Sequence, residues 1–353
     1  MAAPTVVTCE VYATRLSDPA LEVGLKVKIA TDLRDSVEIF QSVEYARFLS
    51  ILMPVFTDIL MNSQPVFVSH APEQKLRGTI LEIVHRFPHN DSFRQYAPDL
   101  LKLLMHLLRV ENEDNAVICL KTIIDLHRSY KQILESQVQP FIDIVQEMYR
   151  NMEQTVKDNF DNPGTPLGQT PGGPSALTSP RPVSPASELT DQPSKVLAKS
   201  LFSFKVLTEC PIIVVLLFQT HRQFVNPNIA TFIPLIIQTL GLQATQQAEA
   251  QRLAAAHGEV FVGVSPAIRN RSVYTDFIVA QVKTMSFLAY ILRGSANVLR
   301  PHQNAIPDFV VRLLRDCPPE AAATRKALNF SWPLVTFYPS TLDRPSCQRS
   351  IFC

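Results

Sequence analysis

The sequence predicts an all-α fold, an irregular α-solenoid of HEAT-type helix pairs, from three observations. Residues 96–131 show the pattern of two helices with apolar faces, joined by a short acidic turn. The second helix of this pair is apolar on almost every side, so it must be packed between neighbouring helices. Similar pairs recur along the chain at irregular intervals, which is typical of stacked helical repeats.

The first helix of this central pair follows from leucines at the spacing of one helix face: Leu100, Leu103, Leu104, Leu107 and Leu108. Pro98 suits the first turn of that helix, because the amide that proline lacks would have no partner there. In the turn at residues 111–115, we expect Asp114 or Asn115 to cap the second helix. The polar side of the second helix is a narrow stripe: Lys121, Asp125 and Arg128.

Helices are also predicted on both sides of the central pair. On the N-terminal side they cover residues 21–40, 45–61 and 76–87, with a kink expected at Pro54 and a stop at Pro88. On the C-terminal side, residues 133–160 are helical. These elements make up the first predicted region, a set of HEAT-like repeats at residues 1–160.

The composition changes abruptly at residues 161–193, which contain eight prolines and four glycines. Such a segment buries too little apolar surface to offset the entropy lost on ordering, so we expect it to be disordered. We interpret it as a long insertion within one repeat. Four of its hydroxyl residues precede proline, the pattern that proline-directed kinases recognise: Thr165, Thr170, Ser179 and Ser184. The alternative is compositional chance in a segment rich in proline and serine.

HEAT-like repeats are predicted to continue over residues 194–328. A helix is expected to start at Ser194 and to break or bend at Pro211, and residues 226–228 are expected to form a turn. A helix at 229–240 should pair with one at 274–293, with a helical extension and a loop between them. A last pair is expected after Pro307. Residues 329–353 have no helical period, and we expect a divergent, disordered tail.

The bulk composition allows a large core and excludes some classes of function. Of the 353 residues, 46% are hydrophobic and 18% are charged, and the net charge is +1. This balance favours neither nucleic acid nor an anionic membrane as a direct partner. With no secretory signal and no clear membrane span, we expect a soluble intracellular protein. Two of the six cysteines, Cys119 and Cys210, lie in apolar runs and are expected to be buried free thiols.

Three groups of residues resemble chemical sites, and each has a simpler interpretation. His85 and His89 have the spacing of metal ligands on a helix, but Pro88 lies between them and no third ligand is near. Cys119 and His127 are more than two helical turns apart, too far to act as nucleophile and base. The acidic turn at 111–114 lacks the glycine and the spaced acceptors of a calcium loop. We therefore expect no catalytic residue, no metal site and no cofactor.

Several segments together resemble the transformation/transcription domain-associated protein family. They are Lys75-Leu76-Arg77 with residues 81–86, residues 111–120 (ENEDNAVICL), 124–127, 203–217 (SFKVLTECPIIVVLL), 232–236 and 274–293 (YTDFIVAQVKTMSFLAYILR). The resemblance covers most of residues 10–328 and places the chain at the extreme N-terminal part of the family. The chain departs from the family pattern in its long insertion and in its sequence after Leu328.

The resemblance implies a non-catalytic HEAT-repeat scaffold. Proteins of this family are subunits of SAGA and NuA4/TIP60-type histone acetyltransferase complexes, are nuclear, and receive transcription activators. Their kinase-like region lies far beyond a chain of this kind and is taken to be a pseudokinase. The expected partners are therefore acetyltransferase complex subunits and activators, with no direct nucleic acid and no membrane.

Two alternatives come from other classes of protein. A transport receptor or a phosphatase scaffold is also a HEAT solenoid, and helical periodicity does not distinguish them. A lipid or protein kinase is the second alternative. The glycine-rich loop and the HRD-type and DFG-type motifs of a kinase are missing from this sequence.

Overall fold

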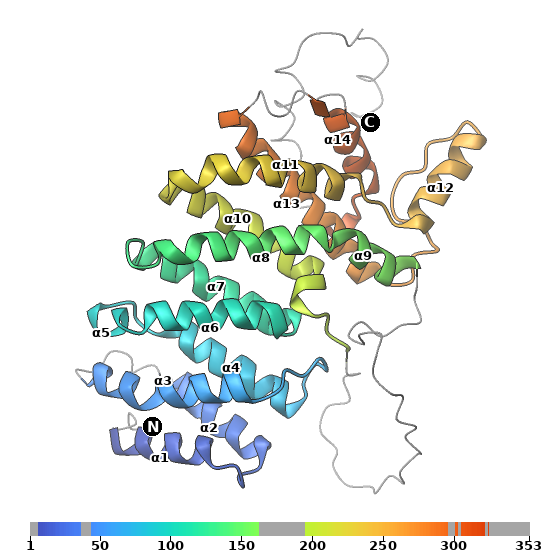
Figure 1. Cartoon of the computed structure of the whole chain (residues 1–353). Coiled ribbons are helices and arrows are strands. Elements are labelled where there is room, and N and C mark those ends of the chain that lie inside the picture. Colours follow the sequence, from blue (N-terminus) through green and yellow to red (C-terminus); the bar gives the residue numbers. More distant parts are fainter. Residues whose placement is uncertain are drawn as a thin grey trace, which may run out of the picture. The chain divides into compact units, whose positions relative to one another are not determined.

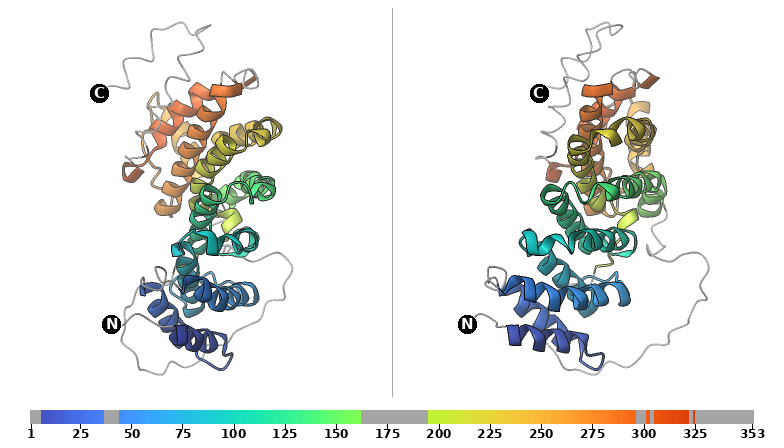
Figure 2. Two further views of the ribbon diagram at one scale, coloured as in Figure 1. Left: turned by 90° about the vertical axis from the view of Figure 1, so that its left-hand side faces the viewer. Right: turned by 60° about the vertical axis from the view of Figure 1, so that its left-hand side comes forward.

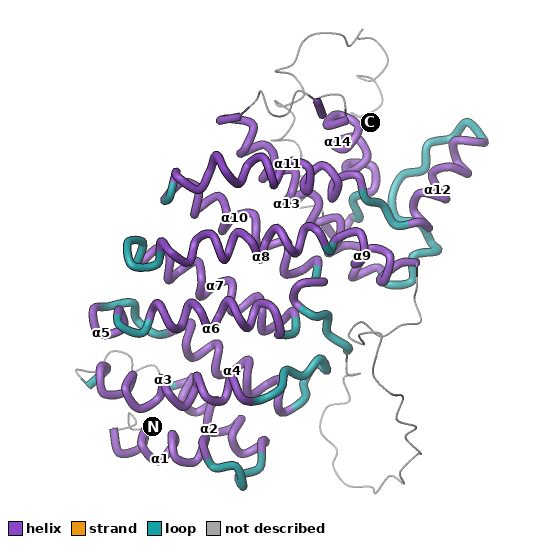
Figure 3. The backbone as a smooth tube through the Cα atoms, in the orientation of Figure 1, coloured by secondary structure: helices purple, strands orange, loops and turns teal. Residues whose placement is uncertain are grey.

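The computed structural model describes residues 6–36, 44–161, 195–295, 301–302, 305–321 and 324. Within these ranges it contains fourteen α-helices and no β-strand, only two isolated bridges (Figure 3). The predicted all-α fold is confirmed. The insertion after residue 161 and the tail at 329–353 lie outside the described residues. The chain forms two compact units, residues 1–228 and residues 229–353, each considered by itself below.

The first unit consists of two rows of helices. One row contains α2 (Val23–Asp35), α4 (Pro72–Arg86), α7 (Glu113–Ser129) and α10 (Phe204–Thr220), which contact one another in that order. The other row contains α1 (Val6–Ser17), α3 (Tyr45–Asn62), α6 (Ala97–Val110) and α8 (Val138–Arg150) (Figures 1 and 2). The short helices α5 (Asp91–Arg94) and α9 (Met152–Val156) flank the second row. This arrangement of paired, stacked helices is that of a HEAT-type solenoid.

The core of the first unit lies between the two rows. The five leucines that predict α6 are at most 7% exposed, and Cys119, Ile123 and Leu126 of α7 are fully buried. Burial of each such side chain contributes about 1.5–3 kcal/mol relative to exposure. The thiols of Cys119 and Cys210 are buried and free, as predicted. The stability of each helix therefore comes from the neighbours that cover it.

The second unit contains α12 (Thr245–Ala256), α13 (Arg271–Ser295), α14 (Ala305–Asp316) and most of α11 (Val225–Gly241). The predicted pairing of α11 with α13 is confirmed. The amide of Gln281 donates to the carbonyl oxygens of Thr239 and Leu242 at 2.8 and 2.9 Å. The rings of Phe232 and Phe287 meet edge to face at 5.3 Å between centroids.

A buried carboxylate explains the glutamines of α12 and the segment before it. Asp316, 2% exposed, accepts hydrogen bonds from the side-chain amides of Gln251, Gln243 and Gln247 at 2.5, 3.2 and 3.4 Å. Burial raises the pKa of Asp316, and Arg315 opposes that rise. The extension and loop predicted at residues 241–272 are therefore α12, at Thr245–Ala256, with non-helical residues on either side, and side-chain amides anchor this stretch to α14.

Two predicted boundaries are wrong. The helix expected to start at Ser194 begins at Phe204, where Ser203 caps it, and it runs on through Pro211. The turn expected at residues 226–228 is instead the first turn of α11, a position that tolerates Pro227. Asn228 is 4% exposed because its side chain bonds to Gln139 and Gln146 of α8. These long-range bonds replace the turn that the local sequence favours.

One helix is long and apolar enough to cross a membrane by length and composition alone, at Arg222–Gly241. Its buried residues include Phe232, Ile233 and Ile236, whereas Ala230, Pro234 and Gln238 are exposed. Such alternation of buried and exposed positions is typical of the packed helices of a repeat protein. Packed helices of this kind can also be long and apolar enough to pass the length and composition test for a membrane span.

Candidate functional site

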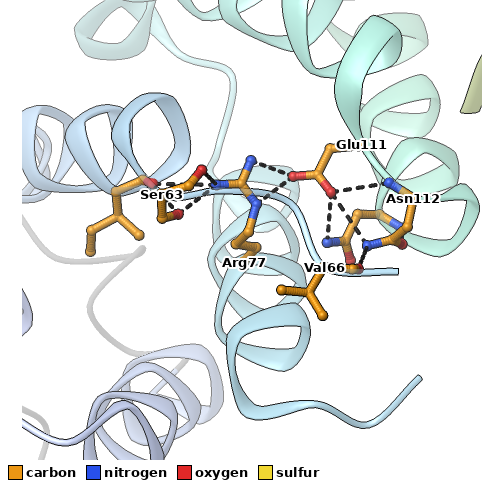
Figure 4. Close-up of polar contacts among 7 residues, drawn as sticks. Ser63, Val66, Arg77, Glu111 and Asn112 are labelled. Carbon is orange, nitrogen blue, oxygen red and sulfur yellow. Dashed lines mark hydrogen bonds and ion pairs between the residues drawn. The ribbon is translucent and has the colours of Figure 1, made fainter. Parts of the chain in front are cut away.

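The most specific polar arrangement in the first unit surrounds Arg77 of α4. Its guanidinium is buried, and its Nε donates to the Glu111 carboxylate at 2.5 Å, with Nη2 facing the same carboxylate. Its Nη1 donates to the carbonyl oxygen and the hydroxyl of Ser63, at 2.8 and 2.6 Å (Figure 4). Ser63 follows the last residue of α3, where carbonyl groups lack helical partners. Arg77 thus joins the end of α3 to the turn between α6 and α7.

The Glu111 carboxylate is satisfied by two asparagines as well as by Arg77. Its Oε2 accepts the side-chain amides of Asn112 and Asn115 at 3.4 and 3.2 Å. The Asn112 amide also donates to the carbonyl oxygen of Val66 at 3.0 Å (Figure 4). A buried ion pair is tolerated only when such additional bonds satisfy the remaining polar atoms. Here Ser63 supplies such bonds to Arg77, and the two asparagines supply them to Glu111.

Asn112 also starts α7. Its Oδ1 accepts the backbone amide of Asn115 at 3.0 Å, which makes Asn112 the N-cap. The expected cap by Asp114 or Asn115 is therefore wrong by two or three positions. The physical reason is that the Asn115 side chain is already bonded to Glu111, and Asp114 pairs with Lys205 at 2.5 Å.

Gly78, next to Arg77, allows α4 and α7 to approach closely. A Cβ atom built at Gly78 would lie 2.8 Å from Oδ1 of Asn115. Contacts of that length do not occur in folded proteins, so any larger residue must displace the asparagine. A glycine inside a helix costs stability by itself, and here the close approach explains its presence.

An extended stretch at residues 195–199, named here the return segment, crosses the same region on leaving the insertion. The amide of Leu197 donates to the carbonyl oxygen of Phe67 at 2.8 Å, and the amide of Ser69 donates to that of Lys195 at 2.9 Å. Farther along, the amide of Glu113 donates to the carbonyl oxygen of Ala198, also at 2.9 Å. The return segment thus ties the loop before α4 to the turn before α7.

The other carboxylates of the acidic turn have partners within the chain. Glu113 accepts the hydroxyl of Ser203 at 2.7 Å and lies 3.9 Å from the Lys195 ammonium. With Glu111 and Asp114 paired as above, the turn acts as a junction between repeats. Its charges are matched by basic and hydroxyl groups of the chain itself rather than arranged to hold a cation.

The histidine candidates do not converge. Nδ1 of His85 lies 3.7 Å from the Asp125 carboxylate, whereas Nδ1 of His89 contacts the Ser129 hydroxyl at 3.0 Å. Burial lowers the pKa of His89. Among the residues that the structure describes, no three His, Cys, Asp or Glu side chains form a group that could hold a metal ion.

The thiol candidate is a core residue. Burial, followed by the nearby Glu111 charge, raises the pKa of Cys119 well above its usual value, which disfavours the reactive thiolate. Burial also lowers the pKa of His127 to about 4. The stripe on α7 faces outward, with Lys121 and Arg128 exposed and Asp125 half-buried. The predicted phosphorylation residues Thr165, Thr170, Ser179 and Ser184 lie outside the described residues.

Sequence reasoning missed the role of Arg77, although it used Arg77 and Glu111 in the family resemblance. The sequence did contain one signal for a buried polar site: Arg77 occupies a core position of α4 and is followed directly by Gly78. The partner could not be deduced, because Glu111 is 34 residues away. The return segment was missed for the same reason, since all its partners are distant in sequence.

The fold and this site define a class of protein: a HEAT-type solenoid in which buried polar groups connect neighbouring repeats. Comparisons with known proteins agree. A family model described as the Tra1 HEAT repeat central region matches residues 273–332. The SAGA complex/NuA4 acetyltransferase complex subunit TRA1 of Saccharomyces cerevisiae is 35% identical over 340 residues, which covers 90% of this chain and 9% of the relative.

Two further relatives extend the match to distant organisms. A probable transcription-associated protein 1 of Dictyostelium discoideum is 34% identical, covering 85% of this chain and 7% of the relative. The transformation/transcription domain-associated protein of Homo sapiens is 31% identical, and the match covers 90% of this chain and 8% of the relative. The chain belongs to the transformation/transcription domain-associated protein family, as a HEAT-repeat segment. It spans less than a tenth of the length of these relatives.

Proposed function

We propose that this chain is a non-catalytic scaffold segment of a transcription coactivator, acting within SAGA-type and NuA4-type histone acetyltransferase complexes in the nucleus. The observation that carries the proposal is the 35% identity, over 90% of the chain, to a subunit named for both complexes. The related protein of Schizosaccharomyces pombe, 32% identical, bears the same complex names. The proposed partners are acetyltransferase complex subunits and transcription activators, without direct contact to nucleic acid or membrane.

The physical mechanism is the presentation of surface. A solenoid offers long rows of helices, and many weak contacts along a row add up to a stable interface. The Arg77–Glu111 pair and the return segment fix neighbouring repeats against one another, so the outer surfaces keep a defined spacing.

The test is affinity purification of the protein that carries this chain, tagged at its own locus, followed by mass spectrometry. Recovery of histone acetyltransferase subunits is the expected result. Recovery of a small GTPase or of phosphatase subunits in their place would favour the transport-receptor or phosphatase-scaffold alternative. An ATP-binding assay on the same chain tests the kinase alternative, and no saturable binding is expected.

We also propose that the insertion is modified at its Ser/Thr-Pro sites, with Ser179 and Ser184 as the principal positions and Thr165 and Thr170 as further ones. Support comes from the residue pattern, in which each hydroxyl directly precedes proline. Phosphopeptide mapping from interphase and mitotic cells is the test. Peptides recovered without phosphate in both states would refute the proposal.

A further inference from the structure

We propose that a groove between α3 and α6 binds a partner-protein segment that combines apolar and positively charged side chains. The groove has a volume of about 500 Å³. Its lining residues come from α3, from the two residues just before α6 and from the start of α6, and they include Met53, Met61 and Leu100. The helices α3 and α6 are neighbours in one row of the first unit (Figure 1), and the groove is lined by residues of both.

The groove lining includes apolar and adaptable side chains beside its polar ones. Leu100 and Met53 are buried, whereas Met61 is 49% exposed. Pro54, also exposed, adds an apolar ring to the wall. Methionines are flexible and polarisable, so surfaces that contain them adapt to varied apolar side chains.

The rim of the groove is negatively charged. Asp58 and Asp99 both line it, and no lysine, arginine or histidine is among the lining residues. Within the part of the chain that the structure describes, the Asp58 carboxylate accepts a neutral side-chain amide, from Asn62 at 2.6 Å, and forms no ion pair. The ion pair of Asp99 with Lys102 is 3.0 Å long, but both side chains are largely exposed. An exposed pair of this kind contributes little and exchanges readily for another cation.

Charge complementarity therefore selects the occupant. Carboxylates beside an apolar groove favour a segment with lysine or arginine next to leucine, phenylalanine or methionine, and they repel an acidic segment. The volume accommodates a few such side chains rather than a whole domain. The inference deepens the scaffold function proposed above by naming the chemistry of one partner segment.

The experiment measures binding of three synthetic peptides to the whole chain by fluorescence anisotropy. The peptides have equal length and identical leucine and phenylalanine positions, and their polar positions are all lysine, all glutamine or all glutamate. The lysine peptide should bind most tightly and the glutamate peptide least. The double variant Asp58→Asn/Asp99→Asn should weaken the lysine peptide about tenfold or more while affecting the glutamine peptide little. Met61→Gln should weaken both.

A matched control removes two exposed carboxylates elsewhere. Asp143 accepts the amide of Gln139 at 2.8 Å, as Asp58 accepts that of Asn62, and Glu249 pairs with Arg252 at 3.5 Å, as Asp99 pairs with Lys102. The variant Asp143→Asn/Glu249→Gln has the same charge change and should bind the lysine peptide as the native chain does. Equal weakening in both double variants, or a glutamate peptide that binds as tightly as the lysine peptide, would overturn the proposal.

Analytical sedimentation tests whether a second copy of this chain occupies the groove instead of a partner segment. If the native chain self-associates and Met61→Gln abolishes that association, the groove is an interface between copies and the proposal is wrong. A monomeric native chain is the expected result. Because the peptide assay uses only the purified chain, its failure would leave the purification test of the scaffold function unaffected.

Discussion

Arg77 and Glu111 form an ion pair in the interior of the first unit, with side chains 2% and 0% exposed. The pair joins α4 to the turn between α6 and α7, and the Arg77 guanidinium also bonds the residue that ends α3. Two fully desolvated charges are stabilising only together, since either one alone would remain buried without its partner. The first prediction follows from this coupling.

Arg77→Met and Glu111→Leu should each lower the free energy of unfolding by about 3–5 kcal/mol, because each leaves an uncompensated buried charge. The double variant should lose less than the sum of the two single losses. Urea unfolding followed by circular dichroism measures all three. Arg109→Ala serves as the control, since the Arg109–Glu147 pair is 43% and 37% exposed and should contribute less than about 1 kcal/mol. A single-variant loss no larger than that of the control would contradict the coupling.

Gly78→Ala should destabilise the chain, although alanine is normally preferred in a helix by about 1 kcal/mol. The added methyl would meet Oδ1 of Asn115 at 2.8 Å and displace an asparagine that binds Glu111. Gly241→Ala is the matched control, because a Cβ atom there has nothing within 4 Å. In thermal unfolding, Gly78→Ala should lower the melting temperature, whereas Gly241→Ala should raise it or leave it unchanged. A stabilised Gly78→Ala variant would show that the close approach is unimportant.

Leu197→Pro should release the return segment. Proline has no amide to donate to the Phe67 carbonyl, and a lost hydrogen bond of this kind costs about 1 kcal/mol. Cleavage by trypsin after Lys199, a site that both proline variants keep, should accelerate, as measured by limited proteolysis and mass spectrometry. Val196→Pro is the control, since the Val196 amide makes none of the bonds that hold the segment. If both variants are cleaved at the native rate, the segment does not depend on this pairing.

Acid should destabilise the first unit through His127. Its side chain is 2% exposed, neither ring nitrogen has a hydrogen-bond partner within the described residues, and burial followed by the nearby His221 lowers its pKa to about 4. Between pH 4 and the usual pKa of about 6.5, the unfolded chain binds a proton that the folded chain excludes. The contribution of the neutral His127 imidazole to the free energy of unfolding is therefore fully present above about pH 6.5, and it is lost as the pH falls toward 4.

The loss amounts to about 3 kcal/mol across that window. The measurement compares the free energy of unfolding of the native chain and of His127→Leu at several pH values from 4 to 7. The difference between them should shrink or change sign as the pH falls, because the variant has no imidazole to protonate. Parallel curves for the two proteins would contradict the assignment of a low pKa to His127.

Helical periodicity predicted the helix pairs well, because a row of leucines on α6 leaves few alternatives for its packing. Local signals failed where distant residues decide the conformation. Residues 195–199 have apolar spacing compatible with a helix, yet bonds to Phe67, Ser69 and Glu113 hold them extended. Asn228 lies in a turn-like sequence, but the amides of α8 draw it into the start of α11.

The buried site illustrates the same limit. The acidic turn suggested that Asp114 or Asn115 caps the helix, but the cap is Asn112. The importance of Glu111 depends on Arg77, and no pattern within either segment indicates that the two side chains meet. Pairing across 34 residues is a property of the packed repeats rather than of local sequence.

The most direct test of the central claim is an acetyltransferase assay. The protein that carries this chain is immunoprecipitated from nuclear extract, and transfer of labelled acetyl groups to histones is measured against a mock precipitate. A scaffold of SAGA-type and NuA4-type complexes predicts acetylation well above the mock level. Histone acetylation at the mock level, from a precipitate that contains the intact protein and its stable partners, would contradict it.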